Sequence, residues 1–208
     1  MRPSVQIAIC VALTAFAART ALAQDHLTPD PTPPPEQYFA KIREVFADVL
    51  RNDIIVQELV VPSFQPEEIV GIRRSDKGFE AFASKPSSHV WLTFNGEKGA
   101  PDYRQIHVQT EARAISDALT ERIRNIWRSM LLDARAPTEA LDGLDGEDYY
   151  FSMPHADKPY VSATVWSPEK GKTVALVALG EGLAAYARGK ADEAALIKLI
   201  EPLERTKA

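Results

Sequence analysis

Apolar side chains recur at helical spacing along three stretches of the chain. In residues 36–50 they return every three or four positions, with charged residues between them, which is the pattern of an amphipathic helix. A second stretch follows Ser116, a residue type that often caps helix N-termini, and stops near Pro137. A third occupies residues 191–205. Each stretch predicts a helix with one face directed at a core.

A fourth apolar stretch covers residues 173–187 and ends at Gly189, where helices commonly stop. It predicts a helix. Its first part, residues 173–179, is so continuously apolar that a buried strand fits the pattern equally well. We keep both interpretations for that part and expect about four α-helices in the chain.

Strand patterns fill the middle of the chain. Alternating or β-branched apolar residues, bounded by turn residues, predict strands at 54–61, 69–74, 79–83, 90–94, 105–111, 149–153 and 160–166. The Ser-Asp-Lys-Gly sequence at 75–78 suits a hairpin turn between two of them. The whole pattern predicts an α+β fold, in which an antiparallel β-sheet meander with one buried and one solvated face is packed by the helices.

The first residues carry a different pattern. Arg2 precedes an apolar run over residues 5–18, and an Ala-Leu-Ala sequence follows at 21–23. We interpret residues 1–23 as a secretory signal peptide, which places the protein in the periplasm or outside the cell. An uncleaved anchor and a lipoprotein acylated at Cys10 are the alternatives. The run is shorter than the roughly 20 residues of a membrane span, which favours cleavage.

Proline dominates residues 24–35 and predicts an extended leader, because this density suits neither a helix interior nor a central strand. Residues 36–206 then form a single α+β domain. The only cysteine, Cys10, leaves with the signal, so the mature chain has no thiol chemistry. Loss of Arg2 and Arg19 lowers the formal net charge from −5 by two units. The acidic charge argues against nucleic acid as a partner. No second long apolar run follows, so we expect no membrane span after cleavage.

Residues able to catalyse hydrolysis are present, but they match no known motif. Ser87-Ser88-His89 puts hydroxyls beside an imidazole, yet neighbours on a strand point to opposite faces, and the chain has no G-x-S-x-G sequence. His89 and His107 belong to no H-x-x-x-H pair, although neighbouring strands would allow a two-histidine site. We assign no catalytic residue and expect no cofactor.

An acidic, glycine-containing loop follows the second predicted helix. Asp142, Asp145 and Glu147 are a calcium candidate in this loop, although their spacing departs from the D-x-D-x-D-G pattern. Adjacent carboxylates also occur at 67–68 and 147–148. They would serve a glycosidase only if the fold set two of them across a cleft.

A surface for another protein is the better-supported candidate site. Aromatic and Arg side chains are enriched at binding hot spots, and a solvated sheet face would gather them. The candidate binding residues are Arg73, His89, Trp91, His107, Tyr149, Tyr150 and Trp166. Trp91 and Trp166 would be core residues instead if helices covered this face of the sheet.

Six short runs are spread over the mature chain. They are Phe79-Glu80-Ala81-Phe82, His89-Val90-Trp91, Ile126-Trp127-Arg128-Ser129-Met130-Leu131, Leu141-Asp142-Gly143, Tyr149-Tyr150-Phe151 and Trp166-Ser167-Pro168. Together they resemble a group of signal-peptide-bearing bacterial, periplasmic proteins of unknown function. The resemblance brings no catalytic residue and implies action through other proteins.

The sequence thus predicts an exported, non-enzymatic protein that binds another protein. An inhibitor, or an immunity factor against an envelope-acting toxin, fits its size and export. The partner would be an envelope protein or a protein delivered into the envelope. The alternatives are a hydrolase or metal-dependent enzyme built on His89, His107 or the acidic loop, and a small-ligand carrier with a pocket between sheet and helices.

Overall fold

The strands form one sheet at the centre of the molecule. The computed structural model describes residues 26–29, 36–50, 53–96, 98–99, 101–137, 145–156 and 158–205. Seven strands, each antiparallel to its neighbours, lie in the order β1-β7-β6-β2-β3-β4-β5. They are β1 (Thr28–Pro29), β2 (Ile54–Pro62), β3 (Glu68–Ser75), β4 (Gly78–Pro86), β5 (Val108–Ile115), β6 (Glu147–His155) and β7 (Lys158–Trp166). The predicted α+β fold is confirmed.

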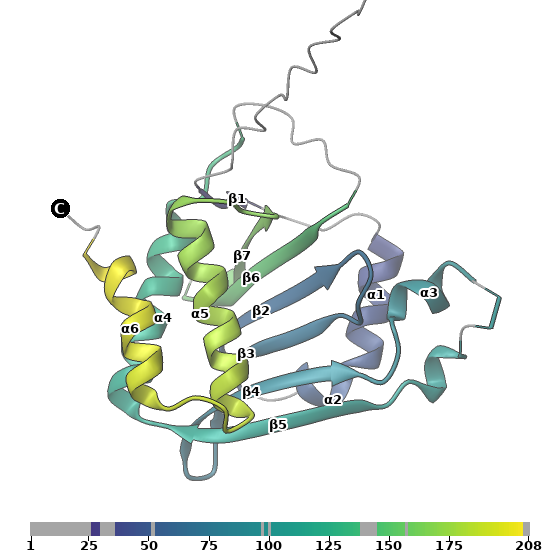
Figure 1. Cartoon of the computed structure of the whole chain (residues 1–208), viewed down its shortest axis with the longest axis horizontal. Coiled ribbons are helices and arrows are strands. Elements are labelled where there is room, and N and C mark those ends of the chain that lie inside the picture. Colours follow the sequence, from purple (N-terminus) through teal and green to yellow (C-terminus); the bar gives the residue numbers. More distant parts are fainter. Residues whose placement is uncertain are drawn as a thin grey trace, which may run out of the picture.

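Helices cover both faces of this sheet (Figure 1). One face, called the α1 face below, carries α1 (Glu36–Val45), α2 (Ala47–Leu50) and α3 (Val90–Phe94). The opposite face, the α5 face, carries α4 (Asp117–Leu132), α5 (Gly171–Ala187) and α6 (Glu193–Glu204). Within the described ranges, no helix has the length and apolar character that crossing a bilayer requires.

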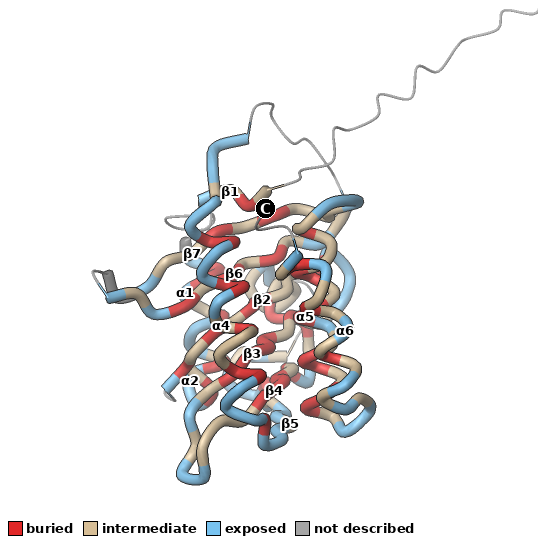
Figure 2. Tube along the Cα trace, turned by 90° about the vertical axis from the view of Figure 1, so that its left-hand side faces the viewer, coloured by how far each residue is buried: buried red, intermediate tan, exposed pale blue. Residues whose placement is uncertain are grey.

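Alternation along the strands divides the core into two parts. Ile69 and Phe82 pack with the helices of the α1 face, whereas their neighbours Val70 and Ala81 pack with those of the α5 face. Figure 2 shows buried residues along the strands and on the helix sides turned toward them. The predicted solvated face is therefore wrong over much of the sheet, because α1, α2 and α3 cover it.

Residues 90–94 form helix α3 instead of the predicted strand. Their composition is typical of a strand, and nothing local to the segment favours a helix. The carboxylate of Glu67 accepts hydrogen bonds from the backbone N–H groups of Val90 and Trp91, at 2.8 and 3.0 Å. These amides begin the helix and have no partner within it, so a distant residue stabilises the helical state.

Residues 171–187 form one continuous helix, α5, so the strand interpretation of residues 173–179 is wrong. Helix α5 is apolar on several sides because it packs on β3 and β4 and also against α6. It stops where predicted, since Gly189 follows it with a φ of +70°.

The start of β5 differs from the predicted one, whereas the start of α4 agrees with the prediction. The strand begins at Val108, so only part of the predicted segment 105–111 belongs to it, and His107 lies exposed just before it. Ser116 occupies the N-cap position of α4 as predicted. Its hydroxyl donates to the Glu193 carboxylate at 2.9 Å instead of capping the helix.

The proline-rich leader is not wholly separate from the domain. Leu27 is buried in the core of the α5 face, and its carbonyl accepts the N–H of Arg135 at 2.9 Å. Thr28 and Pro29 pair with β7 as strand β1. The folded unit therefore includes residues ahead of the predicted start at 36. The signal peptide at 1–23 lies outside the described residues and stays a prediction.

Candidate functional site

Two cavities lie side by side on the α1 face, between α1 and the strands. The first has a volume of about 420 Å³ and is lined by Tyr38, Phe39, Val61, Pro62, Ser63, Phe64, His89, Trp91, Asp145, Asp148 and Tyr150. The second, of about 430 Å³, is lined mainly by apolar side chains of α1, β2 and β6, with Tyr160 of β7. Phe39 and Tyr150 belong to both, so the cavities meet at this pair of rings.

Aromatic side chains form the walls of these cavities. Tyr38 and Trp91 meet edge to face with their ring centroids 4.9 Å apart, and Phe39 and Tyr150 do so at 5.0 Å. We call the surface made by Tyr38, Phe39, Phe64, Trp91, Tyr150 and Tyr160 the aromatic groove. Phe64 and Tyr160 are its exposed members, with 75% and 53% of their surface open to solvent.

Glu67 is fully buried between α1 and α3. Besides the two amides of α3, its carboxylate accepts the hydroxyl of Tyr38. Burial, reinforced by the Glu67 carboxylate, raises the pKa of Tyr38 far above its usual range, so this hydroxyl stays protonated and keeps donating. One buried carboxylate thus joins α1, the β2–β3 loop and α3, and it holds the Tyr38–Trp91 wall in place.

Among the polar residues that line the first cavity, His89 is the one best suited to catalysis. Its Nε2 lies 3.4 Å from Oε1 of Glu67, and the ring is almost fully buried. A histidine oriented by a carboxylate is the usual arrangement for a general base. Here the same carboxylate is already engaged by Tyr38 and by α3, which is the pattern of a structural anchor. The contact between His89 and Glu67 thus helps to hold the wall of the groove in place. The enzyme alternative stays a prediction.

No family model, curated protein or solved structure matches this chain. The resemblance to signal-peptide-bearing bacterial proteins therefore stays a prediction. What the groove does has to be inferred from its own residues.

Three of the predicted binding residues, His89, Trp91 and Tyr150, come together in the first cavity. Tyr149 does not join them, because adjacent strand residues point to opposite faces, and it lies on the α5 face. Trp166 pairs with Asp148 in the β6–β7 register and so shares the groove's face. It lines neither of the two cavities.

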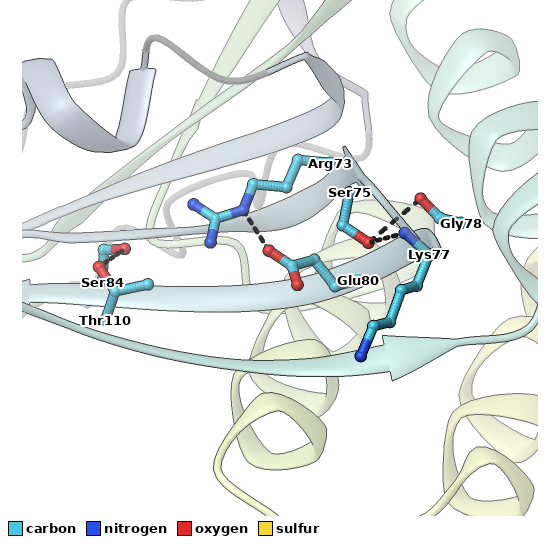
Figure 3. Close-up of polar contacts among 7 residues, drawn as sticks. All are labelled: Arg73, Ser75, Lys77, Gly78, Glu80, Ser84 and Thr110. Atoms are coloured by element: carbon cyan, nitrogen blue, oxygen red, sulfur yellow. Dashed lines mark hydrogen bonds and ion pairs between the residues drawn. The ribbon is translucent and has the colours of Figure 1, made fainter.

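Arg73 lies apart from the groove, toward the β4 side of the sheet. Its Nε donates to the Glu80 carboxylate on β4 at 2.7 Å (Figure 3), and its guanidinium stacks 5.0 Å above the Phe82 ring. His107 is exposed before β5, and its backbone exchanges hydrogen bonds with Ser87. Arg73 is thus held by the sheet, and neither residue lines the cavities that form the groove.

The calcium candidate is only partly described, because Asp142 lies outside the described residues. Asp145 is exposed at the edge of the first cavity, and the Glu147 carboxylate accepts the hydroxyl of Tyr149. In the part of the chain that the structure describes, no three His, Cys, Asp or Glu side chains are grouped as a metal site. The calcium prediction as a whole stays untested.

Several residues of the site, among them Tyr38, Phe39, Phe64 and Glu67, were not among the predicted binding residues. Tyr38 and Phe39 occupy ordinary apolar positions of an amphipathic helix, so nothing separated them from core residues. Glu67, beside another glutamate, had the pattern of surface charge. Phe64 carried a usable signal, because an aromatic residue between Ser63 and Gln65 in a polar loop has no core to enter.

Proposed function

We propose that this chain is an exported protein that binds another protein, and that the aromatic groove takes an extended segment of that partner. The observation that carries the proposal is the groove itself, two joined cavities flanked by the exposed rings of Phe64 and Tyr160. Aromatic anchors around an apolar depression are the composition of binding hot spots. Contact between these exposed apolar rings and water is unfavourable, and a bound partner would remove it.

Charge indicates the character of the bound segment. Asp145 and Asp148 line the end of the groove near Phe64, and the chain as a whole is acidic. We therefore expect apolar side chains in the groove and a Lys or Arg beside these two carboxylates. Complementary charge of this kind raises the association rate and fixes the register of the partner. Within this proposal, an inhibitor or an immunity factor against an envelope-acting toxin is the finer assignment.

Affinity capture from envelope extracts tests the proposal. The tagged protein is compared with Phe64→Ser and Tyr160→Ser, which remove exposed rings of the groove without opening the core. The matched control is Leu132→Ser on α4, an apolar residue that is 62% exposed on the opposite side of the sheet. We expect one partner to be recovered with the native protein and the control, and its affinity to fall at least about tenfold in each groove variant.

Three outcomes would count against this assignment. Equal affinity of the native protein and both groove variants would place the binding surface elsewhere. Recovery of a small molecule in place of a protein would favour the ligand carrier. Absence of any partner, together with turnover of a hydrolase substrate by the purified protein, would favour the enzyme. A partner whose own activity falls on binding supports the inhibitor assignment.

A further inference from the structure

A third cavity, of about 270 Å³, lies on the α5 face, between β2, β3, β6 and α5. Glu58 of β2 lines it and is only 1% exposed. Among the described residues, both of its carboxylate oxygens are buried without a hydrogen-bond partner. Buried polar groups are nearly always paired, so an orphaned carboxyl at a cavity wall points to a missing partner.

The helix opposite is shaped to receive this carboxyl. A Cβ placed on Gly180 of α5 would lie only 1.5 Å from Oε2 of Glu58. The Glu58 carboxyl therefore occupies the space of an α5 side chain, and any residue except glycine at position 180 would force the end of this side chain to move. Glycine lowers the stability of a helix interior. A buried acid without a partner and a glycine inside a helix, two features that each lower stability, thus meet at this wall.

Charged side chains from every neighbouring element surround the cavity. Its lining includes Glu68 of β3, Glu147 of β6 and Glu181 of α5, together with Lys85 of β4 and Arg188 at the end of α5. Arg188 is held by the Glu68 carboxylate, and Glu147 accepts the hydroxyl of Tyr149. Carboxylates outnumber cations around the cavity, and Glu58 has neither cation as a hydrogen-bonding partner.

We propose that this cavity binds an organic cation, a guanidinium or an alkylammonium group, on the carboxyl of Glu58. A guanidinium matches the two orphaned oxygens with two parallel N–H donors, and an ammonium satisfies them as a point charge. Binding would ionise Glu58 and supply its missing counter-ion. Because both oxygens are now covered, the Glu58 side chain must rotate toward the cavity as the cation enters.

The cation has two possible sources, a free amine and the side chain of an Arg or Lys residue in a polypeptide. Agmatine, which carries a guanidinium and a primary ammonium at pH 7, serves as the free cation, and N-butylurea is a neutral compound with the same four-carbon chain. A blocked Gly-Arg-Gly peptide presents the same guanidinium from a polypeptide. Binding to the purified protein is measured by calorimetry and by the thermal shift at a pH near 7.

We expect agmatine to bind and N-butylurea not to bind. Glu58→Gln should weaken agmatine binding at least about tenfold, because the charge partner is lost while the side-chain shape is kept. Lys85→Gln should strengthen it, since a competing cation leaves the cavity. Glu121→Gln, at an exposed ion pair of α4, is the control and should change nothing. Tighter binding of the peptide than of agmatine would identify a protein side chain as the source.

Equal binding of agmatine to the native protein and to Glu58→Gln would overturn the proposal, as would the absence of any agmatine binding. A folded state of each variant is confirmed by circular dichroism, so a loss of binding is not mistaken for unfolding. The cavity lies across the sheet from the aromatic groove. Failure here therefore leaves the proposed protein binding untouched, and loss of binding in the Phe64 variant leaves the cation site untouched.

Discussion

Two buried glutamates lie on opposite sides of the sheet and differ in their hydrogen-bond partners. Glu67 accepts hydrogen bonds from Tyr38 and from two amides of α3. Glu58 accepts none. Burial, followed by the charges of Glu181 and Glu68, raises the pKa of Glu58 well above its usual 4.5. Glu67 is thus held by three donors, whereas burial favours the protonated form of Glu58.

The neutral state of Glu58 predicts a pH dependence of stability. Folding favours the protonated form, so the folded chain binds more protons than the unfolded chain between pH 4.5 and the raised pKa. The free energy of unfolding should therefore fall as the pH rises from 4.5 through this window. Glu58→Gln, which cannot ionise, should lose this slope. The measurement is urea unfolding of both proteins from pH 4.5 to 9.

A native protein whose pH profile matches that of Glu58→Gln would contradict this prediction. Other groups titrate in the same range, so the difference between the two profiles is the quantity to compare. The unfolding slope with urea serves as the internal check, because an unchanged slope means that both proteins expose the same surface on unfolding.

At the scale of the element, α3 is the clearest case of a segment whose conformation depends on a distant residue. It has five residues and cannot be stable alone. Glu67 accepts its first amides, while Val90 and Trp91 pack against α1 and the core of the α1 face. The wall of the aromatic groove therefore depends on a residue more than twenty positions away in sequence.

Glu67→Gln should destabilise the protein by about 2 kcal/mol, because one acceptor oxygen becomes an NH₂ group facing buried donors. The loss should be accompanied by a change in the tryptophan fluorescence, since Trp91 rests on this network. Glu44→Gln, at an exposed i,i+3 ion pair of α1, is the matched control and should change stability by less than about 0.5 kcal/mol. Equal effects of the two variants in urea unfolding would refute the anchoring role.

For the whole molecule, the decisive feature is a sheet covered by helices over much of both faces, with the side chain of Leu27 buried as well. β1 adds only two residues to the sheet, yet the preceding Leu27 is 1% exposed and lies in the same core as Trp127 and Leu176. Residues 27–29 thus close the α5 face next to β7. They are part of the fold.

Leu27→Ala should lower the free energy of unfolding by about 2–4 kcal/mol, the range for removing a fully buried leucine side chain. Leu132→Ala makes the same chemical change at an exposed position of α4 and should have almost no effect. The free energy of unfolding of both variants is measured by thermal and urea unfolding and compared with that of the native protein. A loss below about 0.5 kcal/mol for Leu27→Ala would mean that the leader contributes nothing to stability.

The sequence by itself determined the features that depend on local pattern. The amphipathic helices, the β2–β5 meander and the end of α5 at Gly189 follow from the spacing of apolar residues and from backbone preference. Glu58 was also visible as a single charge in the apolar strand 54–61, although its meaning was not. These features are set by neighbours in the chain, which a sequence displays directly.

Only the tertiary structure decided which surfaces meet. It turned residues 90–94 into a helix, decided that Tyr150 and not Tyr149 lies on the α1 face, and drew Leu27 into the core. It also set the carboxyl of Glu58 against Gly180, 122 positions away in sequence. Each of these outcomes depends on contacts between distant segments. Burial and hydrogen bonding across such contacts outweigh local preference, so the aromatic groove and the Glu58 cavity become visible only in the folded molecule.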